Sequence, residues 1–215
     1  MLPFTIEQFL GVFASYNRAI WPAQVFAYLM GGLAFSLVFR KGRWSDQIIA
    51  GILASMWAWT GIVYHLIFFA SINKLAYVFG ALFAMQAAAF IYFAVSRSHL
   101  NFGYTGRPAG FIGVALVAYA AAIYPLFGLE MGQLPNQLPT FGVTPCPVTI
   151  FSFGMLLLTT APVSRWLLVI PFLWSLVGGS AAIFLRVPQD WALLMAGIVS
   201  LALLIVRDRR MAPAG

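Results

Sequence analysis

The sequence predicts an all-α, polytopic membrane protein with seven transmembrane helices. The composition is 62% hydrophobic and only 8% charged, and the mean hydropathy is +0.93. A soluble domain carries roughly 25% charged residues, which it needs to cover its surface. The charged residues also divide the chain into apolar blocks, most of which reach the ~20 residues that a helix needs to cross a bilayer. These blocks are continuous rather than alternating, so helices are favoured over a β-barrel.

The first expected element is a short amphipathic helix over residues 5–18. Its start has the pattern of a capping box, in which the Thr5 hydroxyl accepts from the Gln8 amide and the Gln8 side chain reaches back. Apolar residues follow at helical spacing, namely Ile6, Phe9, Leu10, Phe13 and Tyr16. We expect this helix to lie flat on the outer membrane surface.

The seven membrane-spanning helices are expected over 20–39, 47–70, 74–95, 109–129, 145–163, 166–186 and 188–206. The last block is short, and it is lengthened by starting at Pro188, because proline is tolerated in the first turn of a helix. The loop over 130–144 contains Pro, Gly and Asn, which argues against a further helix. With no linker or soluble domain in view, residues 1–215 form one integral membrane domain.

The basic residues predict an outside N-terminus and a cytoplasmic C-terminus. One side of the membrane receives Arg40, Lys41, Arg43, Arg97, Arg107, Arg165, Arg207, Arg209 and Arg210. The other side receives Arg18, Lys74 and Arg186. The expected location is therefore the bacterial cytoplasmic (inner) membrane, with the lipid bilayer as the main partner. The net charge of +7 is interpreted as a topology signal, and no nucleic-acid partner is expected.

The acidic residues are all expected outside the membrane interior. Glu7, Glu130 and Asp190 fall on the outer side, where they form a mildly acidic vestibule that favours a cation or neutral solute. Proton pumping commonly uses buried carboxylates. Since none is expected here, the sequence favours facilitated passage over proton coupling.

Polar residues on several helices share a depth in the outer half of the membrane. Because polar groups in lipid are costly unless they are satisfied, we expect them to face one another. The hypothesis is an outward-facing polar cavity that binds a ligand and is lined by Gln24, Tyr28, His65, Cys146, Thr149 and Ser180. The alternative interpretation is that these residues make ordinary interhelical hydrogen bonds.

Two candidate chemistries involve His65 and Cys146. In Thr144-Pro145-Cys146-Pro147 the prolines free carbonyls beside a thiol, and such a pair can ligate a soft metal, with His65 as the only nitrogen ligand in view. His65 with Ser180 or Cys146 is also the remote candidate for an intramembrane enzyme. Neither reading meets its usual requirements, since a soft-metal site needs more ligands and no oxyanion donors are identifiable. We therefore expect no cofactor and no enzymatic activity.

Several segments together resemble a bacterial family of small multi-pass membrane proteins. These segments are Trp21-Pro-Ala-Gln24, Tyr64-His65 with Phe68-Phe69 and Ile72-Asn73, Thr144-Pro-Cys-Pro-Val-Thr-Ile-Phe151, and Gly178-Gly-Ser-Ala through Val187-Pro-Gln-Asp-Trp191. The family has no established function, and its members are sometimes labelled permeases. The resemblance implies a membrane location and no catalytic residue.

The expected function is transport or channelling of a small solute through the outer polar cavity. The alternative is a non-transporting membrane subunit, or a sensor of a ligand or lipid, that works through a partner membrane protein. Seven helices could also form two repeats of three helices joined by a single helix, as in some small sugar transporters. No repeat at the level of residues supports this arrangement.

Overall fold

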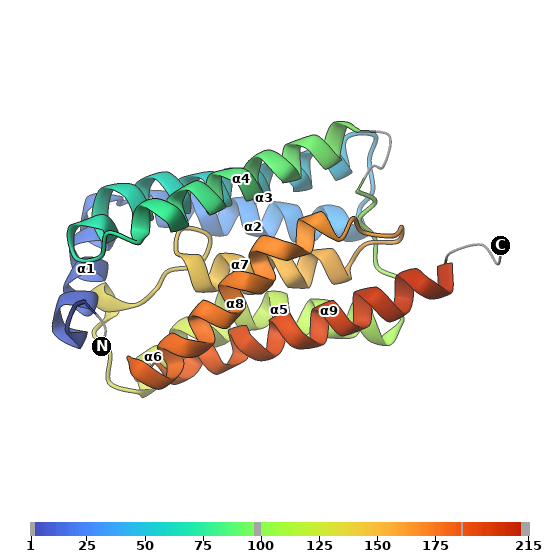
Figure 1. Cartoon of the computed structure of the whole chain (residues 1–215). Helices are drawn as coiled ribbons and strands as arrows, with labels where there is room; N and C mark the ends of the chain where they lie inside the picture. Colours follow the sequence, from blue (N-terminus) through green and yellow to red (C-terminus); the bar gives the residue numbers. More distant parts are fainter. Residues whose placement is uncertain (1–2, 97–99, 186, 212–215) are drawn as a thin grey trace.

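The computed structural model describes residues 3–96, 100–185 and 187–211, and this part of the chain is all-helical (Figure 1). The α-helices are α1 (Ile6–Ala19), α2 (Ala23–Phe39), α3 (Ser45–Trp59), α4 (Ala76–Val95), α5 (Pro108–Ala118), α6 (Tyr124–Glu130), α7 (Pro145–Leu157), α8 (Trp166–Phe184) and α9 (Trp191–Met211). Two π-helical segments, η1 (Thr60–Phe68) and η3 (Tyr119–Ile123), continue α3 and α5. Short 3₁₀ turns are η2 (Phe69–Ser71), η4 (Pro135–Gln137) and η5 (Pro188–Asp190).

Five helical stretches of the described residues are long and apolar enough to cross a membrane. They are Ser45–Ser71, Ala76–Val95, Pro108–Glu130, Trp166–Phe184 and Pro188–Met211. A sixth is obtained if α1 and α2 count as one span, although they meet at an angle of 84°. The described residues therefore contain five or six of the seven long apolar spans that the sequence predicts.

The outer surface of the bundle is apolar, and several polar side chains are inside. Val95 and Phe184 are exposed by 71% and 65%, whereas His65, Gln86 and Ser200 are fully buried. A soluble monomer rarely exposes large contiguous apolar patches. The apolar outer surface is compatible with a membrane protein whose outer face contacts lipid.

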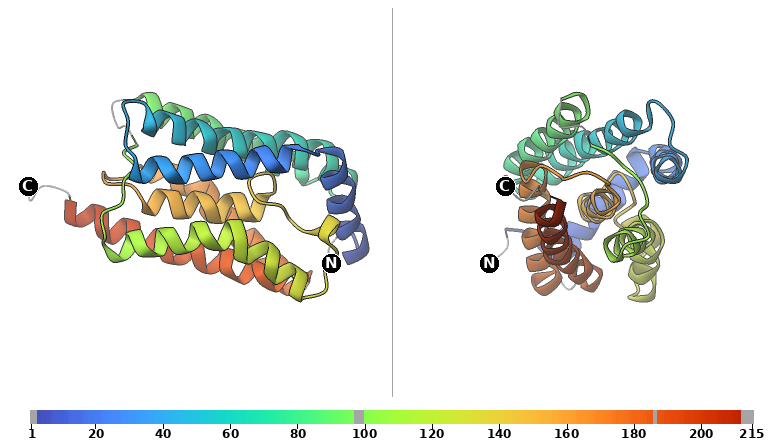
Figure 2. Two further views of the ribbon diagram at one scale, coloured as in Figure 1. Left: turned by 180° about the vertical axis from the view of Figure 1, so that it is seen from behind. Right: turned by 90° about the vertical axis from the view of Figure 1, so that its right-hand side faces the viewer.

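Helix α7 is a short helix at the centre of the bundle. It packs against α3, α5, α8 and α9, and the end-on view in Figure 2 shows it surrounded by other helices. It has 13 residues, and at ~1.5 Å per residue it is roughly 20 Å long, shorter than a bilayer core. The expected helix over 145–163 thus ends at Leu157, where the backbone turns to pair Thr159 with Phe102.

Helix α1 lies across one end of the bundle (Figure 1). The predicted capping box at Thr5 is present, with reciprocal bonds of 2.9 and 3.2 Å to Gln8. The apolar face of α1 packs on η1, where the ring of Phe13 lies 5.3 Å from that of Tyr64. The loop over 131–144 contains only the short turn η4 and is attached to α1, because Asn17 donates to the carbonyl of Leu138 at 2.8 Å.

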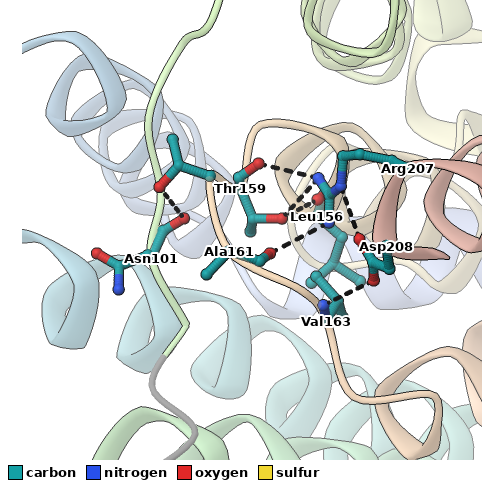
Figure 3. Close-up of polar contacts among 8 residues, drawn as sticks. Asn101, Leu156, Thr159, Ala161, Val163, Arg207 and Asp208 are labelled. Carbon is teal, nitrogen blue, oxygen red and sulfur yellow. Dashed lines mark hydrogen bonds and ion pairs between the residues drawn. The ribbon is translucent and has the colours of Figure 1, made fainter. Parts of the chain in front are cut away.

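The opposite end is held together by Arg207 of α9 (Figure 3). Its guanidinium contacts Asp208 at 2.8 Å and donates to the carbonyls of Thr159 and Ala161 at 2.9 and 3.2 Å. Asp208 in turn accepts from the amide of Val163 at 2.9 Å. This network fixes the extended segment that follows α7. Arg97, His99 and Arg186 lie outside the described residues.

Candidate functional site

The structure buries a carboxylate that the sequence analysis places outside. Asp190 is only 3% exposed and lies in η5, directly before α9. The expectation that it lines an exposed vestibule is therefore wrong, because η5 folds inward beside α6. The salt bridges of the described residues are Lys41–Asp46 and Arg207–Asp208, and neither involves Asp190. A buried carboxylate without a cationic partner is costly and commonly marks a functional site.

Two side chains from two other helices lie beside Asp190, and a third lies next to one of them. The Tyr124 hydroxyl of α6 donates to Asp190 Oδ1 at 2.5 Å. Cys146 of α7 lies near Asp190, and Trp174 of α8 lies near Cys146. These contacts bring together residues that are far apart in the sequence and form what we call the Asp190 cluster: Tyr124, Cys146, Trp174 and Asp190.

The Asp190 cluster lies against the first turn of the central helix α7. Cys146 is the second residue of that helix, which begins at Pro145. Pro145 and Pro147 have no N–H, so the amide of Cys146 is the only backbone donor in the first three positions of this helix. The segment before α7 is irregular yet buried, since Phe141, Val143 and Thr144 are at most 3% exposed. Broken helices whose ends meet at buried polar groups are a recurrent arrangement at transporter binding sites.

The two π-helical segments both lead to this region. Segment η3 ends directly before Tyr124, and η1 contains His65. Pi-helical turns are rare and are frequent at functional sites, because the extra residue redirects side chains. Here they turn Tyr124 and His65 into the bundle interior, where the two side chains are 1% and 0% exposed.

His65 is enclosed by aromatic rings. Its ring centroid lies 4.8 Å from Phe83, 5.1 Å from Trp174 and 5.7 Å from Phe79. Neither ring nitrogen has a hydrogen-bond partner among the described residues. Trp174 contacts both His65 and Cys146, so these two of the six expected cavity residues share a neighbour.

The other four expected cavity residues each donate to a backbone carbonyl. Gln24 donates to Asn17 at 2.7 Å, at the end of α1, and Tyr28 donates to Ala121 at 3.0 Å. Thr149 and Ser180 donate within their own helices, to Pro145 at 2.8 Å and to Val177 at 2.6 Å. Tyr28 and Ser180 are exposed on the outer surface of the bundle. The structure therefore places Cys146 near Asp190 and His65 against Trp174, and it gives the other four residues separate environments.

A void of 260 Å³ lies elsewhere, between α2 and α3. It is lined mainly by apolar residues, among them Phe26, Met30, Met56 and Trp59. No group of three His, Cys, Asp or Glu side chains within the described residues is placed to hold a metal ion. His65 and Cys146 thus have no third ligand of these types in the part of the chain that the structure describes. Ser180, being exposed and bonded to Val177, does not meet His65, which is enclosed by rings.

Sequence reasoning missed Asp190 and its neighbour Gln189. Gln189 is 1% exposed, its carbonyl accepts from Tyr119 at 3.1 Å, and its Oε1 has no partner among the described residues. The available signal was the position of Pro188-Gln189-Asp190 inside the last apolar block, which the prediction already treats as helical. A carboxylate in the first turn of a spanning helix is a candidate for burial wherever a neighbouring helix supplies a hydroxyl.

The fold and this cluster define a class of protein: an all-helical chain with apolar helices of membrane-spanning length around a buried carboxylate. The sequence model of the family described as "Family of unknown function (DUF6064)" matches residues 6–214. The chain belongs to this family. The comparison with curated proteins and the comparison with solved structures each gave no match.

Proposed function

We propose that this chain is a seven-crossing protein of the bacterial cytoplasmic membrane that moves a small solute across the bilayer. In this proposal Asp190 binds and releases a proton during transport. The observation that carries it is the burial of Asp190 beside Tyr124 and Cys146, next to the start of the short central helix α7. An intramembrane ionisable residue without a charged partner is a functional-site hypothesis by default.

The path of the chain supports seven crossings. The segment before α7 meets α1 at one end of the bundle, through Asn17 and Leu138. The segment after α7 meets the end of α9 at the other, through Val163 and Asp208. Although α7 alone is short, its flanking extended segments reach both ends of the bundle, which supports the proposal of a seventh passage. Non-helical backbone at membrane depth is tolerated where protein covers it.

The buried carboxylate changes the expected mode of transport. Facilitated passage was favoured only because every acidic residue was expected outside the membrane interior. Asp190 supplies a group that can be neutralised by a proton, while the hydroxyl of Tyr124 stabilises its ionised form. A site that stabilises both forms suits a proton that must bind and leave.

The test is proton movement in liposomes that contain the purified full chain and the pH-sensitive dye pyranine. A potassium diffusion potential drives protons inward, and glucose, alanine and sodium are supplied outside one at a time. The wild type is expected to acidify the lumen faster than protein-free liposomes. Asp190→Asn is expected to abolish this excess rate, because an amide cannot exchange the proton.

The matched control is Glu130→Gln, which removes an exposed carboxylate at the end of α6. It is expected to keep the wild-type rate. Equal rates for wild type and Asp190→Asn contradict the role of Asp190. A wild type that acidifies no faster than empty liposomes contradicts proton-linked transport and favours the alternative of a non-transporting membrane subunit.

A further inference from the structure

The end of the bundle opposite to α1 contains a second polar feature, a cavity of 610 Å³ between the start of α5 and the end of α9. Its volume is within the ~300–1,000 Å³ range of small-molecule sites. Its polar lining is basic and hydroxylic, and consists of Arg107, Arg207, Arg210, Thr105, Thr159 and Thr160. Among the described residues no carboxylate lines it.

The three arginines of this cavity differ in how they are engaged. Arg207 is held by Asp208, Thr159 and Ala161, so it is a fixed wall of the cavity (Figure 3). The side chains of Arg107 and Arg210 are exposed and form no hydrogen bond or ion pair within the described residues. Two uncompensated guanidinium groups beside a rigid third one form a site for an anion with several oxygen atoms.

Phosphate fits this site better than a carboxylate ligand. Free phosphate offers three or more acceptor oxygens and a phospholipid phosphodiester offers two, and either set can match guanidinium groups that come from two helices. The hydroxyl of Thr105 adds a neutral donor at the same cavity, whereas the hydroxyl of Thr160 donates to the carbonyl of Asn101 at 3.4 Å. The start of α5 also lines it, and at that end of a helix the dipole favours negative charge.

The cavity also has an apolar wall, made by Pro108, Leu157, Leu203 and Val206. A ligand that carries a hydrocarbon part beside its phosphate would cover this wall. Basic pockets between helices at the cytoplasmic boundary of a membrane are a known setting for anionic headgroups. The shared chemistry is a phosphate group, and its two sources are an anionic phospholipid and free phosphate.

We propose that the cavity between α5 and α9 binds a phosphate group through Arg107 and Arg210, with Arg207 as a fixed wall beside them. This site is separate from the Asp190 cluster, and its test does not depend on transport. The probes are phosphatidylglycerol, phosphatidylcholine and inorganic phosphate, each added to the full chain purified in delipidating detergent. Native mass spectrometry counts the bound molecules and gives the apparent dissociation constant.

The variants are Arg107→Gln, Arg210→Gln and their combination. At ~1 kcal/mol per basic residue near an anionic headgroup, phosphatidylglycerol binding is expected to weaken about fivefold for each variant and about 25-fold for both. Phosphatidylcholine carries the same phosphate with a compensating cation, and we expect it to bind more weakly. Saturation at one tightly bound molecule per chain is expected.

The matched control is Arg209→Gln, which removes the same charge one residue away. Arg209 lines a different cavity, of 260 Å³, together with Arg165 and Asp208. It is expected to change the affinity for phosphatidylglycerol less than twofold. An Arg209→Gln effect equal to that of Arg210→Gln overturns the proposal, because the attraction would then be that of a diffuse surface charge.

The two sources are separated by the third probe. Binding of phosphatidylglycerol that inorganic phosphate does not displace supports a lipid, whereas binding of inorganic phosphate that is lost in the double variant supports a free phosphate compound. The absence of any binding that depends on Arg107 and Arg210 overturns the proposal. Unchanged thermal unfolding of the double variant shows that a loss of binding does not result from misfolding.

Discussion

At the scale of single residues, the buried polar side chains differ in where their hydrogen-bond partners come from. Thr149 and Ser152 satisfy their hydroxyls on carbonyls of their own helix, and Trp57 donates to Ser152 at 2.8 Å. Such bonds cost little, because the partner is already in place. Asp190 is different, since its partners must come from other helices. A residue that requires this assembly is where we expect substitutions to be most damaging.

The first prediction concerns the hydroxyl that contacts Asp190. Tyr124→Phe leaves Oδ1 of Asp190 without this donor and is expected to lower the free energy of unfolding by about 1–3 kcal/mol. The control is Tyr119→Phe, whose half-buried hydroxyl donates to the Gln189 carbonyl at 3.1 Å, and a cost below about 1.5 kcal/mol is expected there. Denaturant titration in mixed micelles measures both. If the two variants lose the same free energy of unfolding, the Tyr124–Asp190 hydrogen bond contributes no more to stability than the bond from Tyr119 to a backbone carbonyl.

At the scale of helices, prolines interrupt the hydrogen-bond ladder and side chains from other helices repair it. Pro171 lies inside α8, and a proline there cannot donate to the carbonyl four residues earlier, that of Leu167. Gln86 of α4 is buried and donates to this carbonyl at 3.0 Å. Tyr28 does the same for Ala121, four residues before Pro125. Both polar side chains therefore act on backbone groups that a proline releases.

The second prediction follows from the Gln86–Pro171 pair. Gln86→Leu leaves the carbonyl of Leu167 unpaired and is expected to cost about 1–3 kcal/mol of unfolding free energy. In a Pro171→Ala background the restored amide can donate to this carbonyl, so the same change is expected to cost about 1 kcal/mol less. A double-mutant cycle in one detergent measures the difference. If Gln86→Leu costs the same in both backgrounds, the repair described here is not what Gln86 does.

At the scale of the whole molecule, the two ends of the helical bundle are closed by different contacts. One end is closed by α1 and the loop pinned to Asn17, and the other end is fixed by Arg207. The distribution of basic residues predicts that the Arg207 end faces the cytoplasm. Both proposals use this architecture: the Asp190 cluster lies toward the α1 end, where η5 and α6 meet, and the phosphate site lies at the Arg207 end.

The third prediction tests this orientation with single cysteines in a Cys146→Ala background. Lys74→Cys and Arg165→Cys replace exposed residues in two connections, one between η2 and α4 and one before α8. In intact spheroplasts a membrane-impermeant maleimide is expected to label Lys74→Cys at once. Arg165→Cys is expected to react only after permeabilisation. The reverse pattern would invert the proposed topology and place the phosphate cavity outside.

The extent of sequence-based prediction differs between fold and site. Long apolar blocks predicted the all-helical fold, and the Thr5 capping box was predicted from four adjacent residues. The loss of the last residues of the expected helix over 145–163 was not predictable, because it depends on pairing of Thr159 with Phe102. His65 and Cys146 were expected to share a site, and their common neighbour Trp174 emerges only from packing. Asp190 was misplaced because its burial depends on a hydroxyl 66 residues earlier in the chain.

The sequence by itself determined that this chain folds into apolar helices, because hydropathy and the spacing of charges are local properties that no partner can alter. Only the tertiary structure decided which polar groups meet. Whether Asp190 faces water or Tyr124, and whether Gln86 serves a ligand or the carbonyl of Leu167, depends on the rotation and depth of helices that are distant in sequence. Those quantities are set by side-chain packing across the whole bundle, which no single segment of the sequence encodes.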